Sequence, residues 1–318
     1  MFRVSLILED VEMPRTLFWE TLLATLKALP NAGSHTIFLP QEDTAMETNW
    51  PRYRNRASSY TRGMGHDISA NGQLKRYFDR VAAWARSHPD DCLLIINMNP
   101  FIRVSNMFRF HRNIHIADGC LSELDRSLNP RSISMPAMPI QVSDSDYQGE
   151  NRRRYLASFQ GVLSHPVRAA LQKCHDGEKI IIQIIEASQH NILKLDATTG
   201  RADQSYRDIM ENADFAFIPR GDALFSYRLL EAMSFGCIPI ILSDNWILPF
   251  DCLIDWASLS LRPREDEILP CITLLNRLTD REVLERKKKV LATYQHYFSS
   301  LEKIISNGLF AELKKCIA

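Results

Sequence analysis

The sequence predicts an α/β protein made of two consecutive doubly wound halves. Short apolar runs alternate with segments of helical apolar spacing along the chain, the pattern of a mostly parallel sheet covered by helices. Gly, Pro, Asn and Asp punctuate this alternation, and 318 residues are enough for two domains of ordinary size. A polar stretch at 141–154 separates the two series. We therefore predict domains at 1–150 and 151–318.

In the first half the spacing predicts a buried strand at 2–8, followed by a helix that Pro14 can start. The remaining elements alternate in the same way, and residues 131–139 are expected to be extended because three prolines close by forbid a long helix. The expected strands are 2–8, 35–39, 92–96 and 113–117, and the expected helices are 16–29 and 71–86.

Between these elements, residues 41–66 carry four arginines interleaved with three aromatic residues. Such a loop could grip an anionic acceptor, but we favour a solvated surface loop.

The second half repeats the alternation and ends in helices. The expected strands are 155–159, 179–185, 215–218, 238–242 and 252–256, and the expected helices are 166–174, 205–213, 224–235, 265–275 and 280–315.

The composition excludes several classes of protein. The chain has 38 basic and 38 acidic residues, and this zero net charge argues against a nucleic-acid-binding protein. No stretch approaches the roughly 20 apolar residues of a membrane-spanning helix, although peripheral membrane contact stays open. Acidic residues arrive at Glu9, so no signal peptide is expected. The seven cysteines lack C-x-x-C spacing, so we expect reduced thiols and a cytoplasmic location.

The strongest local signal lies at 212–251. An apolar run leads into a Pro-Arg-Gly-Asp turn at 219–222, then an amphipathic segment, Gly236 and a second apolar run. A turn between a strand's carboxyl end and a helix N-terminus is where such units bind anions. Arg228 and Glu231 share one helix face and suggest charge for a nucleotide phosphate and an acceptor for a ribose hydroxyl. Spacing alone equally allows a surface ion pair on a plain βαβ unit.

Residues 154–315 resemble the exostosin-type glycosyltransferases, which build heparan sulfate backbones in animals and several wall polysaccharides in plants. The core of the resemblance runs from Phe217 to Phe250. There a Pro-Arg-Gly turn, an S-x-R-x-x-E-A helix start, a G-C-I-P-I strand entry and an S-D-x-W-x-L-P-F exit follow in order. Asp222 stands where animal members tend to carry basic residues, and Phe225 replaces a small residue, so the resemblance does not specify the sugar. The first half resembles the family only loosely.

The resemblance implies a GT-B architecture, in which two Rossmann-like domains face each other across a cleft and the second binds the nucleotide. It also implies inverting transfer of a sugar from a nucleotide sugar, usually a UDP-sugar, to a glycan hydroxyl, with no cofactor and no essential metal. The alternative from a different class is a catalytically inactive glycan-binding or scaffold subunit. The presence of Arg220, Ser226, Arg228 and Glu231 favours the active enzyme.

The resemblance also assigns donor-site roles. Arg220, the amides near Gly221 and Arg228 would stabilise the charge of the leaving diphosphate. Ser226 would cap the following helix and Glu231 would accept the ribose hydroxyls. Arg168 as a surface charge and Ser226 as a cap without ligand contact remain alternatives. The expected donor-site residues are Gly161, Arg168, Arg220, Gly221, Asp222, Ser226, Arg228 and Glu231.

An inverting displacement needs a base that takes the proton of the acceptor hydroxyl. Asp118 and Asp10 follow expected strands of the first half and are the positional candidates, with His111 and His115 as alternates. For each of these residues taken alone, a structural role is favoured over a catalytic one. No metal site is expected, because no Asp-x-Asp pair lies at a strand end and the pair at 144–146 falls in the linker.

Overall fold

The structure is a computed structural model of the chain. It describes residues 37–38, 72–89, 93–97, 108, 111–139, 141–144, 147–185 and 204–317. The strand expected at 2–8, the helix at 16–29, the loop at 41–66 and Asp10 lie outside the described residues.

The chain divides into two compact units that do not follow the predicted boundary. Unit 1 comprises Met1–Met135, Asn245–Leu253 and Ser300–Ala318, and unit 2 comprises Pro136–Asp244 and Ile254–Ser299. Residues 136–150 therefore belong with the second unit, and the last helices belong with the first. The predicted domains 1–150 and 151–318 had placed residues 136–150 in the first domain and the last helices in the second.

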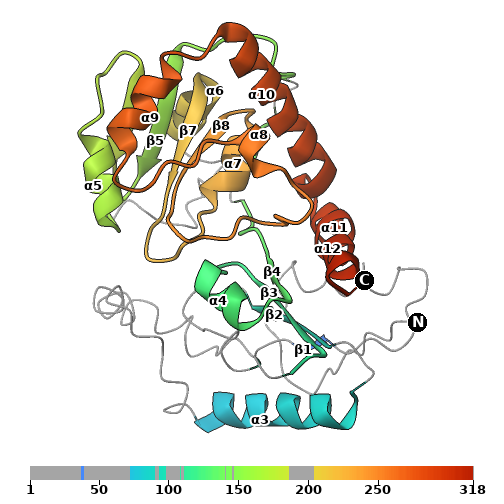
Figure 1. Cartoon of the computed structure of the whole chain (residues 1–318). Coiled ribbons are helices and arrows are strands. Elements are labelled where there is room, and N and C mark those ends of the chain that lie inside the picture. Colours follow the sequence, from blue (N-terminus) through green and yellow to red (C-terminus); the bar gives the residue numbers. More distant parts are fainter. Residues whose placement is uncertain are drawn as a thin grey trace. The chain divides into compact units, whose positions relative to one another are not determined.

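Unit 1 contains a parallel sheet with strand order β1-β2-β3-β4 (Figure 1). Its elements are β1 (Ile37–Phe38), α3 (Gly72–Ser87), β2 (Leu93–Asn97), β3 (Ile114–Asp118), α4 (Glu123–Leu128) and β4 (Ser132–Ser134). The register pairs Asp118 with both Asn97 and Ser134, so these three strand ends lie side by side. The amide of Asn113 donates to the carbonyls of Ala85 and His88 at 3.0 and 2.9 Å, which holds the end of α3 beside β3.

A distant segment and the last helices complete unit 1. Ser134 Oγ donates to the carbonyl of Ile247 at 2.6 Å, and the Phe250 N–H donates to the carbonyl of Ser134 at 3.0 Å. A Cβ on Gly308 would overlap the Phe250 ring, so a glycine is needed where the chain's last helical turns meet this segment. Hydrogen bonds and side-chain packing therefore join three pieces of chain that are far apart in sequence.

Unit 2 contains the second parallel sheet, with strand order β6-β5-β7-β8. Because β6 lies on one side of β5 and β7 on the other, the strand order reverses between β5 and β7. The predicted α/β class with two parallel sheets is confirmed, whereas facing domains across a cleft remain a prediction. The elements are β5 (Tyr155–Gly161), α5 (Pro166–Gln172), β6 (Ile180–Ile184), α6 (Gln204–Glu211), β7 (Ala213–Pro219), α7 (Arg228–Ser234), β8 (Ile238–Leu242), α8 (Trp256–Leu259), α9 (Ile268–Leu275) and α10 (Asp280–Thr293).

Two predicted elements near the C-terminus are wrong. The strand expected at 252–256 is a turn leading into α8. The single helix expected at 280–315 is broken into α10, η2 (Tyr294–Phe298), α11 (Leu301–Lys303), η3 (Ile304–Leu309) and α12 (Phe310–Ile317). Ser300 is extended there, with φ −149° and ψ 158°, and its hydroxyl accepts the Lys303 N–H at 3.2 Å as the cap of a new helix. Apolar residues continue on both sides of this break, so their spacing did not reveal it.

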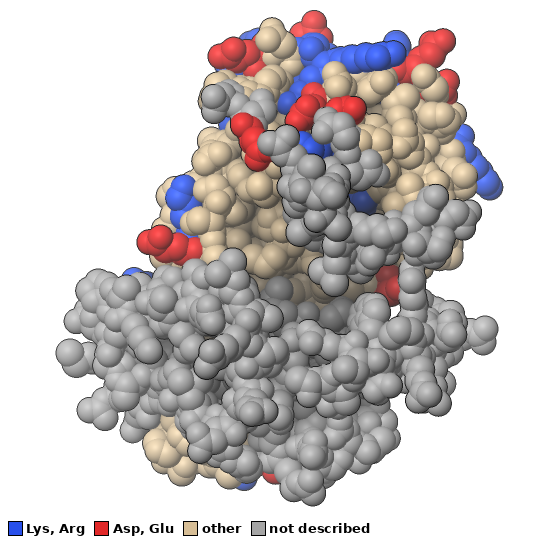
Figure 2. Space-filling model, turned by 180° about the vertical axis from the view of Figure 1, so that it is seen from behind, with Lys and Arg blue, Asp and Glu red and all other residues tan. Residues whose placement is uncertain are grey.

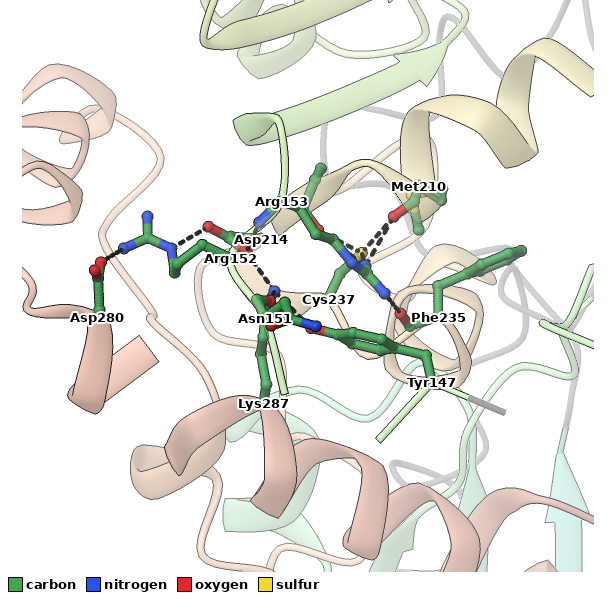
Figure 3. A network of polar contacts seen from close by, with 11 residues as sticks. Tyr147, Asn151, Arg152, Arg153, Met210, Asp214, Phe235, Cys237, Asp280 and Lys287 are labelled. Carbon is green, nitrogen blue, oxygen red and sulfur yellow. Dashed lines mark hydrogen bonds and ion pairs between the residues drawn. The ribbon is translucent and has the colours of Figure 1, made fainter. Parts of the chain in front are cut away.

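The stretch expected to be a linker is held against unit 2 by buried charges (Figure 3). Asp214 on β7 has no exposed side-chain surface, and it accepts bonds from Arg152 Nε at 2.5 Å, the Arg153 N–H at 3.0 Å and Lys287 Nζ. Lys287, on α10, is also fully buried and donates to the Tyr147 hydroxyl at 3.0 Å. This network holds residues 147–154 to unit 2.

The described surface carries charges of both signs. On the face in Figure 2, Lys and Arg are interspersed with Asp and Glu over the described part of the molecule. Among the helices that the structure describes, none combines the length and apolar character needed to cross a membrane.

Candidate functional site

The donor-site residues predicted from the sequence lie at the carboxyl ends of the strands in the unit 2 sheet. β5 ends at Gly161 and its neighbour β7 ends at Pro219, and the strand order reverses between these two strands. Open parallel sheets bind ligands outside the carboxyl ends of strands at such a switch point. The turn at 219–222 and the start of α7 directly follow β7. The topology therefore places the predicted residues where this fold class binds ligands.

Arg168 is buried and bridges the two strand ends, so its alternative as a surface charge is wrong. Its guanidinium donates to the carbonyls of Val162, Arg220 and Pro219 at 3.0, 2.9 and 3.3 Å. A Cβ on Gly221 would lie 3.0 Å from Arg168 Nη2. Gly221 therefore provides the space that this arginine occupies.

Arg228 also turns inward, from the first position of α7. Its guanidinium donates to the carbonyl of Gln160 and lies 4.6 Å from the centre of the Phe159 ring and 5.6 Å from that of Tyr206. Both rings lie within the range of a favourable cation–π contact. A Cβ on Gly161 would lie 3.3 Å from Arg228 Nη2, so this glycine lets Arg228 approach the end of β5.

Glu231 is buried, which excludes a solvent-exposed pair with Arg228. Its Oε1 accepts the Gln141 N–H at 3.1 Å, and its Oε2 accepts the Tyr206 hydroxyl at 2.5 Å. Burial and the neighbouring Glu231 charge raise the pKa of Tyr206 well above its ordinary value. Glu231 therefore holds α6 and the segment at 141 against α7, and its role as ribose acceptor stays a prediction.

Ser226 and Asp222 complete the turn before α7. The helix begins at Arg228, one residue later than Ser226 as a cap would require, and the Ser226 hydroxyl accepts the Arg228 N–H at 3.4 Å. This bond belongs to the first turn of the helix. It is compatible with Ser226 as a donor-site residue and with Ser226 as a residue without ligand contact. Asp222 is exposed at the edge of the cluster.

Arg168, Arg220 and Arg228 leave positive charge without a matching partner. Burial and the charge of Arg228 lower the pKa of Arg168 to about 9, and Asp222 only partly opposes this. Burial, Arg220 and Arg168 likewise lower the pKa of His165. Within the described residues none of the three arginines forms a salt bridge, and the Nε atoms of Arg220 and Arg228 are buried without a hydrogen-bond partner. This arrangement suits an anion with several acceptor oxygens.

The base candidates lie in unit 1. Asp118 is the last residue of β3, as expected of a residue at a strand's carboxyl end, but it is buried and its Oδ1 accepts the Cys120 N–H at 2.7 Å. His111 is partly buried, and burial together with Arg86 lowers its pKa. His115 lies inside β3 and away from the strand end. Asp10 is outside the described residues, so the identity of the base stays a prediction.

His115 is expected to make unit 1 less stable in acid. Burial and the charge of Arg131 lower the pKa of this imidazole from 6.5 to about 4, although a backbone contact from Arg131 opposes this. Between these values the unfolded chain binds a proton that the folded chain does not, so stability falls as pH drops. From pH 6.5 to 5 the loss would be about 1.6 kcal/mol. Urea unfolding of His115→Gln should show a smaller loss than the wild type. An equal loss in both proteins would contradict this role.

The fold and these arginines define an α/β chain with a positively charged site, suited to an anion, where the strand order of its second sheet reverses. The chain belongs to the exostosin family, since the model of the Exostosin GT47 domain matches residues 34–278.

Curated relatives agree with this assignment. The exostosin-1 homolog of Caenorhabditis elegans is 30% identical over 189 residues, which cover 54% of this chain and 49% of that protein. Exostosin-1 of Drosophila melanogaster is 26% identical over 166 residues, covering 48% of this chain and 22% of that protein. The chain spans about half or less of the length of these relatives.

Among solved structures, the GtfA/B complex matches with a TM-score of 0.42 and 15% identity, covering 79% of this chain and 56% of that chain. A TM-score this low says nothing further about fold or activity.

Proposed function

We propose that this chain is an inverting glycosyltransferase that takes a sugar from a nucleotide sugar, of the UDP class, and transfers it to a glycan hydroxyl. The observation that carries the proposal is the cluster of Arg168, Arg220 and Arg228 at the switch point of the unit 2 sheet. Membership of the exostosin family supports sugar transfer as the reaction. The partners are then a nucleotide sugar and a glycan acceptor.

The proposed chemistry is a single displacement. The acceptor oxygen bonds to the anomeric carbon while the bond from that carbon to the diphosphate oxygen breaks, and a carboxylate takes the acceptor's proton. Asp118 and Asp10 are the candidates for that carboxylate. The leaving diphosphate gains negative charge, which the arginines and the turn amides near Gly221 would stabilise. Three guanidinium groups would supply this charge without an essential metal ion.

An inactive glycan-binding or scaffold subunit remains the second candidate. Two observations favour it: Asp118 is buried with its carboxylate bonded to the Cys120 N–H, and both carboxylate oxygens of Glu231 already accept bonds from the protein. The active enzyme predicts transfer or slow hydrolysis of a sugar nucleotide. The inactive subunit predicts neither.

Titration calorimetry with UDP, GDP and CMP tests the donor site. We expect UDP to bind, and Arg228→Ala to weaken binding by about 1.5–3 kcal/mol, because a charged hydrogen-bond donor is lost. Glu231→Ala should also weaken binding if the carboxylate receives the ribose. Arg281→Ala is the matched control, since Arg281 is exposed on α10. Unchanged UDP affinity in both site variants would show that the donor site is assigned wrongly.

A further inference from the structure

His165 is a titratable side chain beside the arginine cluster, and the donor-site assignment leaves it unused. It lies in the loop between β5 and α5, three residues before Arg168. A Cβ on Gly221 would lie 2.9 Å from the Oγ of the neighbouring Ser164 and 3.0 Å from Arg168 Nη2, so this loop touches the turn at 219–222. His165 is half-buried, which leaves part of its ring open to a ligand. The fold therefore places an imidazole next to the site proposed to bind the diphosphate.

The hydrogen bonding of the ring determines which of its nitrogens can serve a ligand. Nδ1 of His165 accepts the Val167 N–H at 3.3 Å, so the proton of the neutral ring is on Nε2. Nε2 lies on the other side of the ring and points away from the start of α5. Within the part of the chain that the structure describes, Nε2 forms no hydrogen bond. It is therefore a donor that stays available for an oxygen atom of a ligand.

The charges around His165 favour a neutral ring until an anion binds. Burial and the charges of Arg220 and Arg168 lower the pKa of His165, and Asp222 opposes them. Arg168 lies on α5, whereas Arg220 and Asp222 lie on the turn after β7, and these are the charged groups that act on the ring. A bound diphosphate would bring negative charge that offsets the repulsion from the two arginines. The protonated ring then becomes favourable in the complex.

Protonation also strengthens the contact that the ring can make. The second proton adds to Nδ1 and displaces the Val167 N–H, whose bond of 3.3 Å is longer than the usual range and therefore weak. The Nε2–H of an imidazolium then donates a charge-assisted hydrogen bond, which is roughly twice as strong as a neutral one. His165 can thus exchange a weak contact within the protein for a strong contact with a phosphate oxygen.

We propose that His165 is a further ligand of the donor's diphosphate and that it takes up one proton from solvent when the diphosphate binds. This inference rests on the proposed function, because the ligand is the diphosphate of a nucleotide sugar. Proton uptake and anion binding are then linked, and each must strengthen the other by the same factor. The affinity for the diphosphate should therefore rise as the pH falls. The imidazolium would also hold the leaving group, because the diphosphate gains charge when its bond to the sugar breaks.

A titration of His165 with and without UDP tests the proposal directly. Nuclear magnetic resonance of the imidazole should show a titration midpoint that rises by at least about one pH unit when UDP is bound, which is a tenfold gain in proton affinity. Calorimetry at about pH 5.5 to 8, the range in which histidine titrates, should show that UDP binding takes up protons from buffers of different ionisation enthalpy.

His165→Asn isolates the contribution of the imidazole. An asparagine can still accept the Val167 N–H at the start of α5, but it does not titrate. The ratio of the UDP affinities of the wild type and His165→Asn should rise about tenfold across the same pH range, by the same linkage. The terminal phosphate of UDP also titrates in this range, and the ratio removes its contribution because that contribution is the same for both proteins.

His296→Asn is the matched control, because His296 is exposed on η2 in the same unit, and it should show the pH dependence of the wild type. If UDP binds but the midpoint of His165 does not move and the affinity ratio is independent of pH, this inference is wrong while the donor site is right. If UDP does not bind to the wild type at any of these pH values, the donor-site assignment is wrong as well. The resonance titration uses the wild type, so it decides the matter even if His165→Asn does not fold.

Discussion

Asp214→Asn is expected to destabilise unit 2 by about 3–5 kcal/mol, because it removes the buried carboxylate that pairs with the buried Lys287. In the described network, Asp214 accepts bonds from Arg152, the Arg153 N–H and Lys287 (Figure 3). An asparagine keeps the size of the side chain but leaves Lys287 buried without a counter-charge. Lys287 would retain only neutral partners, the Tyr147 hydroxyl and the Asn151 carbonyl, each at 3.0 Å.

Removal of the cation should lower the free energy of unfolding less than removal of the anion. Lys287→Met removes the buried cation, yet Asp214 keeps its ion pair with Arg152 at 2.5 Å and its bond from the Arg153 N–H. A methionine also fills most of the volume that the lysine side chain leaves. The network therefore predicts an asymmetry in which loss of the anion is worse than loss of one of its cations.

Urea unfolding followed by tryptophan fluorescence and circular dichroism would measure both effects. Asp280→Asn is the control, because Asp280 pairs with the same Arg152 but its side chain is 77% exposed. Such an exposed pair contributes about 0–1 kcal/mol. Similar losses in Asp214→Asn and Asp280→Asn would mean that the buried network does not hold residues 147–154 to the sheet.

The sequence predicted the strands of unit 2 well because each is a run of apolar residues bounded by turn residues. β8 has the expected bounds, β5 extends beyond the expected strand at its carboxyl end, and β7 extends beyond it at both ends. The order of these strands in the sheet could not be predicted from the sequence, since it depends on which strands pair with each other. The reversal between β5 and β7 places Gly161 beside the turn at 219–222, and that placement makes Arg168 part of the cluster.

The unit boundary could not be predicted because its cause lies in contacts across long stretches of sequence. Residues 141–154 are polar and charged, which is typical of a linker. Instead, the Arg152 side chain and the Arg153 N–H bond to Asp214, and Asp214 also pairs with Lys287, which is 73 residues further along the chain. Tyr206, which bonds to Glu231 and lies under Arg228, gave no signal either, because a tyrosine on an amphipathic helix most often belongs to the core.

Arg220→Ala is expected to lower kcat/KM by about 10²–10³-fold, or about 2.7–4 kcal/mol, with the free energy of unfolding nearly unchanged. Arg220 differs from its two neighbours because its guanidinium has no hydrogen-bond or ion-pair partner among the described residues, and its Nε is buried. A charge held in this way gains its partner only when an anion binds. Loss of this charge should therefore weaken ligand binding and reduce the stabilisation of the charge that develops on the leaving group.

Arg168→Ala provides the contrast within the same cluster. Arg168 donates to three backbone carbonyls, so its removal leaves acceptors at two strand ends without a donor and should cost stability as well as activity. Turnover of UDP-sugars and urea unfolding, measured on Arg220→Ala, Arg168→Ala and the exposed control Arg281→Ala, separate the two effects. If Arg220→Ala kept full turnover while Arg168→Ala lost turnover only in proportion to its stability, the cluster would serve the fold. The leaving group would then need another source of positive charge.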